Sequence, residues 1–179
     1  MCSPVKRGRA VHALGMPVIS IYPGSECRLG SNISLVSVSF ATDLGVNHPV
    51  VLRTLRPGAR IDIGDRVGIS GGSICAAAGV SIGPETLIGA NVTIADTDFH
   101  SLRPQRRVGR REVEPGRPVT IGRRVFIGTN SIILKGVTIG HNTVIGAGSV
   151  VTTDIPENVV AAGNPCRPIR TLSAEELID

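Results

Sequence analysis

The sequence predicts an all-β solenoid, in which short strands joined by corners stack coil upon coil. A branched apolar residue returns at every sixth position between residues 118 and 154. This spacing matches neither the 3.6-residue period of a helix nor the two-residue alternation of a simple strand. The composition agrees with a thin core and many corners, because 22 Gly and 12 Pro accompany only three Phe, one Tyr and no Trp. The periodic residues are Ile121, Ile127, Ile133, Ile139, Ile145 and Val151.

Three short strands per triangular coil would place residues 18 positions apart above one another, so Ile121 is expected on Ile139, Ile127 on Ile145 and Ile133 on Val151. Each coil then depends on its neighbour to exclude water from the core. A Gly follows several of the periodic residues, where we expect a tight corner with a positive backbone dihedral. These glycines are Gly122, Gly128, Gly140 and Gly146.

The N-terminal part of the chain follows the same pattern less regularly. Residues 1–17 show no period, which predicts a loose or capping segment, and residues 41–52 break the pattern as a projecting loop. The period then resumes with Ile63, Ile69 and Cys75 as inward residues. One extra residue near Gly79 shifts the register before the pattern continues to Ile94.

A second interruption separates Ile94 from Ile121, whose spacing of 27 is not a multiple of six. Residues 95–117 are therefore predicted to form an extruded loop, and a long loop inside a compact repeat is usually functional or disordered. Residues 155–179 form a C-terminal tail. Within it, the capping-box pattern from Ser173 to Glu176 predicts a short helix that seals the open end of the stack. We expect residues 1–179 to form one domain.

The net charge and the cysteines limit which binding partners and which cellular compartment we expect. The formal net charge of +5 favours an anionic partner, yet the scarcity of aromatic residues disfavours a nucleic-acid binder. The four cysteines have no C-x-x-C spacing, which predicts free thiols in a reducing compartment and no metal site. Without a long apolar run, we expect a soluble, cytoplasmic protein without membrane insertion.

His100 is the main candidate for catalysis, because it stands where the extruded loop leaves a rigid coil. A neutral imidazole there could take a proton from an attacking hydroxyl or amine. Its other ring nitrogen needs a hydrogen-bond acceptor. The alternative to a catalytic role is an ordinary surface histidine. The acceptors available on the loop are Asp96, Asp98, Glu112 and Glu114.

The other histidines and the loop arginines are weaker candidates. We expect His141 to be an exposed turn residue and His12 to be incidental, whereas His48 approaches a ligand if its loop folds over a neighbouring coil. The arginines of the extruded loop form either a solvated face or an anion-binding site. They are Arg103, Arg106, Arg107, Arg110 and Arg111.

The chain resembles the hexapeptide-repeat acetyltransferases. The resemblance rests on the repeats, on the histidine-bearing segment Asp96–His100, and on the ending from Ile145 to Thr152 and from Ala161 to Arg167. It is most similar to the sugar O-acetyltransferases of the maltose, galactoside and nodulation-factor type and to enzymes of polysaccharide synthesis. The match covers residues 60–172 well.

This resemblance implies a left-handed parallel β-helix and a homotrimer with active sites at the subunit interfaces. It also implies that His100 is the general base and that an acceptor hydroxyl attacks acetyl-CoA directly, without a covalent acyl-enzyme. Glu114 matches the acid that orients the histidine, with Glu112 as the alternative.

The resemblance also assigns binding residues. Asp98, Phe126 and Ser70 are expected beside a saccharide acceptor; Phe126 stands where relatives often carry Trp, and Ser70 departs from the family's pattern. Acetyl-CoA is the implied co-substrate and no metal is expected. The residues implied to hold acetyl-CoA are Gly128, Thr129, Gly146, Ala147, Thr152, Arg167 and Arg170.

Two other functions remain open from the sequence: a xenobiotic or amino-sugar N-acetyltransferase, and a non-catalytic structural β-helix. A zinc hydratase on the same helix would need three histidine ligands, and the four histidines include no closely spaced pair.

Overall fold

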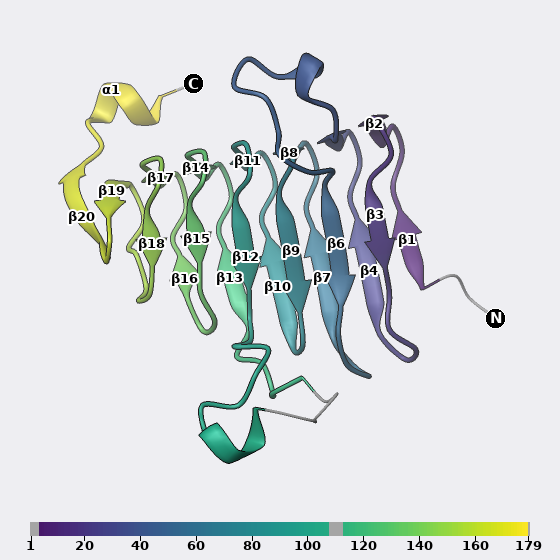
Figure 1. Ribbon diagram of the computed structural model, residues 1–179. Coiled ribbons are helices and arrows are strands. Elements are labelled where there is room, and N and C mark those ends of the chain that lie inside the picture. The colour runs from purple at the N-terminus through teal and green to yellow at the C-terminus, as the bar shows by residue number, and fades with distance from the viewer. Residues whose placement is uncertain (1–3, 108–112, 179) are drawn as a thin grey trace.

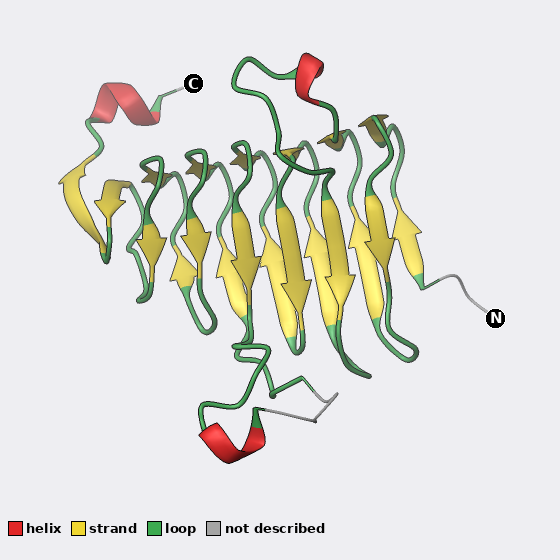
Figure 2. Cartoon of the chain, viewed as in Figure 1, coloured by secondary structure: helices red, strands yellow, loops and turns green. Residues whose placement is uncertain are grey.

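The computed structural model describes residues 4–107 and 113–178. The chain winds into a stack of coils, and each full coil gives one short strand to each of three sheets (Figure 1). Strands of successive coils pair in parallel, whereas β19 and β20 at the C-terminal end pair antiparallel. The described chain is built almost wholly of strands and loops (Figure 2), which confirms the all-β solenoid.

The first sheet consists of β1 (Val5–Arg7), β4 (Glu26–Leu29), β7 (Arg60–Ile63), β10 (Gly79–Ile82), β13 (Val119–Ile121) and β16 (Thr138–Ile139). The second consists of β2 (His12–Leu14), β5 (Ser34–Val36), β8 (Gly68–Ser70), β11 (Leu87–Ile88), β14 (Phe126–Ile127), β17 (Val144–Ile145), β19 (Val159–Gly163) and β20 (Cys166–Thr171). The third consists of β3 (Val18–Ser20), β6 (Val51–Thr54), β9 (Ser73–Ala76), β12 (Thr93–Ala95), β15 (Ile132–Ile133) and β18 (Val150–Val151).

The core is the set of inward branched residues that the six-residue period predicts. All three predicted stacks are confirmed: Ile121 pairs with Ile139, Ile127 with Ile145, and Ile133 with Val151. These side chains are buried, and each contributes about 1.5 to 3 kcal/mol through removal of apolar surface from water.

The glycines after the periodic residues are needed for a different reason from the one expected. Gly122 and Gly128 do not have positive φ; that conformation falls two residues later, at Arg124 (φ 55°) and Asn130 (φ 58°). A Cβ on Gly128 would lie 2.5 Å from the backbone nitrogen of Ala147 in the next coil. The glycines therefore permit the close approach of neighbouring coils, and the prediction of a positive dihedral at these positions is wrong.

The sequence register is wrong by one residue in β9. Ile74, not Cys75, is fully buried and pairs with Ile94, whereas Cys75 pairs with Ala95 and is partly exposed. Ile74 follows Ile69 by five positions instead of six, because the Gly71–Gly72 corner is one residue short.

The first coil begins earlier than expected. β1 and β2 lie inside the segment 1–17 and pair in register with β4 and β5, so residues 5–7 and 12–14 are strands of a first coil rather than a loose segment. The six-residue period is not visible in this segment, because Arg7 and Ala13 stand where branched apolar residues are expected. They pair with the inward residues Leu29 and Leu35 of the next coil. A terminal coil faces water on one side, so these positions need no branched apolar residue.

Two loops leave the stack at opposite ends of the third sheet (Figure 1). Residues 37–50, which include the 3-10 helix η1 (Ser39–Ala41), join β5 to β6. Residues 96–118, which include η2 (Pro104–Arg106), join β12 to β13. Both loops were expected, but the first was predicted at residues 41–52, of which 51 and 52 belong to β6.

The C-terminal tail closes the stack with strands. α1 (Ala174–Leu177) has the predicted capping box between Ser173 and Glu176, but it buries none of its residues. Instead Ile155, Val159, Ala161 and Cys166 cover the last layer of the core. The helix thus does not seal the end, because the apolar residues that do so precede it in the chain.

Candidate functional site

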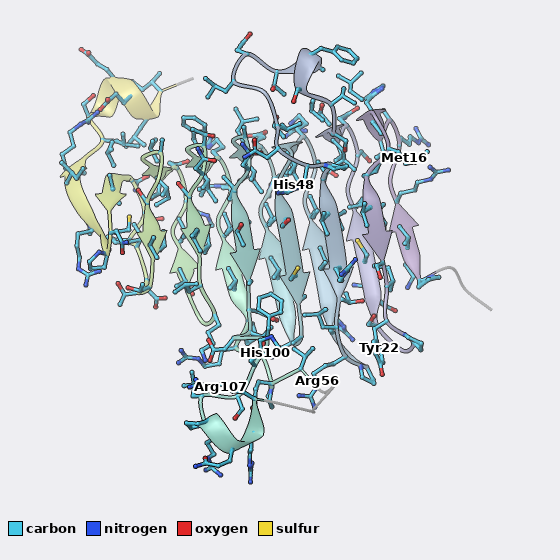
Figure 3. The ribbon with its side chains drawn as sticks, viewed as in Figure 1. Met16, Tyr22, His48, Arg56, His100 and Arg107 are labelled. Atoms are coloured by element: carbon cyan, nitrogen blue, oxygen red, sulfur yellow. The ribbon has the colours of Figure 1, made fainter. Side chains whose placement is uncertain are left out.

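The predicted site residues gather at two different corners of the coils. The loop corner, where the third sheet passes to the first, carries residues 96–118, and the glycine corner, where the second sheet passes to the third, carries Gly128 and Gly146. Figure 3 shows His100 at the loop corner and His48 at the far end of the third sheet. Within one chain the width of that sheet separates the two groups.

Asp96 anchors the extruded loop. Its side chain is fully buried, and its carboxylate accepts hydrogen bonds from the backbone N–H groups of Ala77, Ala78 and Gly79 at 2.6, 2.7 and 2.6 Å. Three charge-assisted bonds satisfy a carboxylate that would otherwise be costly to bury. Asp96 therefore binds the preceding corner and does not orient His100.

His100 is exposed and lines a cavity of about 220 Å³ together with Glu114. The hydroxyl of Thr97 donates to the carbonyl of Glu114 at 2.8 Å, which holds the two arms of the loop together at its base. The described residues make no hydrogen bond to the His100 ring. The loop thus brings the candidate base and the candidate orienting acid to one cavity without joining them, and Glu112, the alternative acid, lies outside the described residues.

Asp98 forms an ion pair with Lys135, which belongs to the corner of the next coil. The sequence reasoning missed Lys135, one of only two lysines in the chain. The strand register indicates that Lys135 lies near the start of the extruded loop. Ile94 pairs with Ile133, and Lys135 follows Ile133 by two residues just as Asp96 follows Ile94. Asp98, which was expected to contact the saccharide acceptor, therefore has its negative charge balanced by a lysine of the same chain.

Two arginines of the same cavity brace the loop. Arg56, at the corner after β6, donates to the carbonyl of Val113 at 3.2 Å. Arg107 donates to the carbonyls of Ser101 and Leu102 at 3.0 and 2.9 Å. Arg56 was not singled out from the sequence, because it lies 44 residues before His100 and only the coil register brings it close. Arg110 and Arg111 lie outside the described residues.

The glycine corner carries most of the candidate acetyl-CoA residues. Gly128, Thr129, Gly146 and Ala147 occupy matching positions in two successive coils, since Ile127 pairs with Ile145. The backbone N–H groups of Thr129 and Ala147 donate to no other described residue.

The predicted acceptor contacts Phe126 and Ser70 also lie on the second sheet, near the glycine corner; Phe126 is 47% exposed and Ser70 is partly buried. The loop 37–50 reaches the equivalent turn of the preceding coil, between β11 and β12, where the N–H of Asn47 donates to the side chain of Asn91 at 2.8 Å. His48 lies here, with its Nδ1 2.7 Å from the carbonyl oxygen of Pro49.

The remaining cofactor candidates lie at the last coil. Thr152 is exposed just after β18. Arg167 donates to the carbonyl of Cys166 at 2.7 Å and contacts the hydroxyl of Thr153 at 3.4 Å. Arg170 makes a two-pronged ion pair with Glu176 at 2.6 and 2.7 Å, so its guanidinium already has an anionic partner.

The described thiols are poor nucleophiles. Burial raises the pKa of Cys27 to about 11. It also raises the pKa values of Cys75 and Cys166, so all three are protonated near neutral pH.

Of the other histidines, His141 is exposed at its corner as expected, and its Nδ1 accepts from the N–H of Arg123 at 3.0 Å.

Comparisons with known proteins identify the family. Residues 118–153 match the family described as "Hexapeptide repeat of succinyl-transferase". A solved galactoside acetyltransferase in complex with coenzyme A is 30% identical with a TM-score of 0.60, covering 98% of this chain and 68% of that one. A hexapeptide-repeat acetyltransferase from Vibrio cholerae O1 biovar eltor, complexed with acetyl coenzyme A, is 30% identical with a TM-score of 0.57, covering 69% and 68%. The chain belongs to the hexapeptide-repeat acetyltransferases.

Among curated proteins, the galactoside O-acetyltransferase of Escherichia coli (strain K12) is 50% identical over 94 residues, which are 52% of this chain and 45% of that protein. The chain spans about half the length of the curated relatives it matches. No helix in residues 4–107 and 113–178 is long and apolar enough to cross a membrane.

Proposed function

We propose that the protein is an acetyl-CoA-dependent O-acetyltransferase that acetylates a hydroxyl of a sugar or polysaccharide precursor. The observation that carries this proposal is the cavity shared by His100 and Glu114, in a chain whose relatives include galactoside O-acetyltransferases. A titratable base at the mouth of a cavity, on a loop anchored to a rigid coil, is what acyl transfer to a hydroxyl requires.

In the proposed reaction, His100 takes the proton of the acceptor hydroxyl as the oxygen attacks the thioester carbonyl. The new C–O bond forms, the C–S bond breaks, and the protonated imidazole returns the proton to the departing thiolate. Glu114 would hold the other ring nitrogen once the acceptor tightens the cavity, because such hydrogen bonds are often long before substrate binds. The raised pKa values of the three described thiols support direct transfer without a cysteine intermediate.

We infer that the pantetheine arm of acetyl-CoA lies along the glycine corner. The N–H groups of Thr129 and Ala147 donate to no other described residue, so they suit its amide carbonyls. The nucleotide end would extend toward Thr152 and Arg167 at the last coil. Arg167 suits a phosphate better than Arg170, because a guanidinium already paired with Glu176 must first exchange its partner.

The two corners lead to a further part of the proposal: the protein is a homotrimer with left-handed coils. One chain cannot bring His100 to its own glycine corner across the third sheet. A neighbouring copy that presents its glycine corner to the extruded loop would complete each site, and cyclic symmetry repeats the arrangement. A cytoplasmic location would follow from the use of acetyl-CoA.

The test is thiol release from acetyl-CoA with a panel of glycosides, using the wild type, His100→Ala and the control His12→Ala. His12 is an exposed histidine on the first coil, so its loss should leave turnover unchanged. Loss of the general base should lower acceptor-dependent release about 10²-fold or more. Equal rates in wild type and His100→Ala would remove His100 from this role, and a protein that neither binds nor turns over acetyl-CoA would not be a transferase.

A further inference from the structure

The cavity beside His100 is strongly basic. Its lining includes Arg56, Arg106 and Arg107 beside His100, Ser101 and Glu114. Its volume of about 220 Å³ is below the roughly 300 Å³ at which most ligand pockets begin. It therefore suits one substituent or one ring rather than a whole oligosaccharide.

The positive charge of this cavity is not balanced by the described carboxylates. Arg56 and Arg107 donate to backbone carbonyls, which orient a guanidinium without neutralising it. The guanidinium of Arg106 makes no hydrogen bond or ion pair with residues 4–107 or 113–178, and only its backbone N–H donates, to the carbonyl of Arg103. Asp98 pairs with Lys135, so among the described residues that line the cavity Glu114 is the one carboxylate beside three guanidinium groups.

Elsewhere in the described chain, one arginine at a coil corner and one in β20 have acidic partners. Arg66 pairs with Glu85, and Arg170 with Glu176. A group of guanidiniums held together without such partners is disfavoured by mutual repulsion unless an anion binds among them. Their fork of donors matches the oxygens of a carboxylate or a phosphate.

We propose, on the basis of the proposed function, that the acceptor is an acidic saccharide whose carboxylate or phosphate binds Arg56, Arg106 and Arg107 while its hydroxyl meets His100. The position along the stack favours the acceptor over coenzyme A as the source of the anion. Arg56 belongs to the coil of β6, whereas the candidate coenzyme residues lie on the coils of β14 and β17 and on the last coil, on the other side of the loop.

The experiment compares acceptors that differ only in charge. Binding of p-nitrophenyl glucuronide and p-nitrophenyl glucoside is measured by calorimetry or saturation-transfer NMR, and glucose 6-phosphate is compared with glucose in the same way. Thiol release is then measured with each acceptor and with varied acetyl-CoA. The variants are Arg56→Gln, Arg106→Gln and the control Arg9→Gln, which removes an exposed charge on the first coil.

The wild type should prefer the acidic member of at least one pair by about tenfold or more, the gain expected from charge-assisted bonds. Arg106→Gln should remove most of this preference without affecting the neutral acceptor, and Arg9→Gln should keep it. Arg56→Gln should do the same and also loosen the loop through Val113. The pair that shows the preference identifies the anion as a carboxylate or a phosphate.

Equal binding of acidic and neutral glycosides would overturn the inference, as would a loss in Arg106→Gln that is the same for both. A raised KM for acetyl-CoA with unchanged acceptor selectivity would assign the arginines to the coenzyme phosphates instead. Binding is measured without turnover, so the inference can succeed or fail whether or not thiol is released, and a failure of the proposed transferase activity remains distinguishable.

Discussion

At the scale of single residues, Asp96 is the strongest fixed point of the candidate site. Replacing it by Ala leaves three backbone N–H groups of the preceding corner without their acceptor. An unsatisfied buried donor costs about 1 to 3 kcal/mol, and water entering the gap offsets part of the sum. We expect Asp96→Ala to lower the free energy of unfolding by about 3 kcal/mol, measured by urea denaturation.

Asp43 provides the matched control, because it is an exposed aspartate in the other loop. Asp43→Ala should change stability by less than about 0.5 kcal/mol. If the two variants proved equally stable, the three short hydrogen bonds would not be what holds the base of the extruded loop.

Gly128 tests whether the glycine corner depends on close contact between coils. An added Cβ would meet the nitrogen and Cα of Ala147 at 2.5 and 2.8 Å, and backbone atoms have little room to move. Gly128→Ala should therefore destabilise the protein by about 1 to 3 kcal/mol, read from the shift in thermal unfolding. Gly79→Ala is the control, since its Cβ would meet nothing closer than 3.9 Å, and a similar loss there would refute the steric explanation.

The candidate site was predictable only where its members are close in sequence. His100 and Glu114 share one loop, and the structure places them at one cavity. The partners of that loop come from distant parts of the chain: Arg56 from an earlier coil, Lys135 from a later one, and the amides of residues 77–79 that hold Asp96. No local pattern marks these contacts, because they arise only when coils stack in a particular register.

At the scale of elements, the period predicts strands well where every corner has the same length. From Val119 onward the inward residues recur every six positions and the predicted stacking is confirmed. The register of β9 was missed because the corner at Gly71–Gly72 is short, and β1 was missed because a terminal coil needs fewer apolar residues. The six-residue period therefore predicts strand positions only where successive corners have the same length.

The C-terminal helix should be sensitive to acid. Hydrogen bonds from Arg170, followed by that from the Ser173 backbone, lower the pKa of Glu176 from 4.5 to about 2. Because the folded pKa lies below the unfolded value, the contribution of this carboxylate is fully present above pH 4.5 and is lost as the pH falls toward 2.

NMR titration of the Glu176 side chain should therefore show a midpoint well below 4.5, and the helical signals of α1 should weaken over the same range. Glu176→Gln should remove this pH dependence and fray α1 already at neutral pH. A midpoint of 4.5 in the wild type would mean that the ion pair with Arg170 does not persist in solution. Protonation of Glu176 itself should leave the core strands unchanged, because α1 buries none of its residues.

At the scale of the whole molecule, the proposed homotrimer rests on the arrangement of the two corners. The extruded loop leaves the third sheet at the C-terminal end of β12 (Figure 1). Gly128 and Gly146 belong to the turns that enter the N-terminal ends of β15 and β18 in the same sheet. A rigid stack of parallel strands cannot fold back on itself to join them. A trimer should have a mass of about three times the 18.6 kDa of one chain, measurable by light scattering.

Complementation distinguishes sites shared between subunits from sites within one chain. His100→Ala removes the base, and Ala147→Trp places a bulky ring on the exposed glycine corner, where it should block the pantetheine arm. Each variant alone should be inactive.

Unfolded together in equal amounts and refolded, the two variants should recover about one quarter of wild-type activity, because a shared site is intact only when it draws its base from one variant and its corner from the other. Mixing the folded variants without unfolding is the control and should give no recovery. Sites contained within one chain would also stay inactive after co-refolding, because every chain then carries one defect; an inactive mixture that still forms trimers would therefore place both corners of each site in the same subunit.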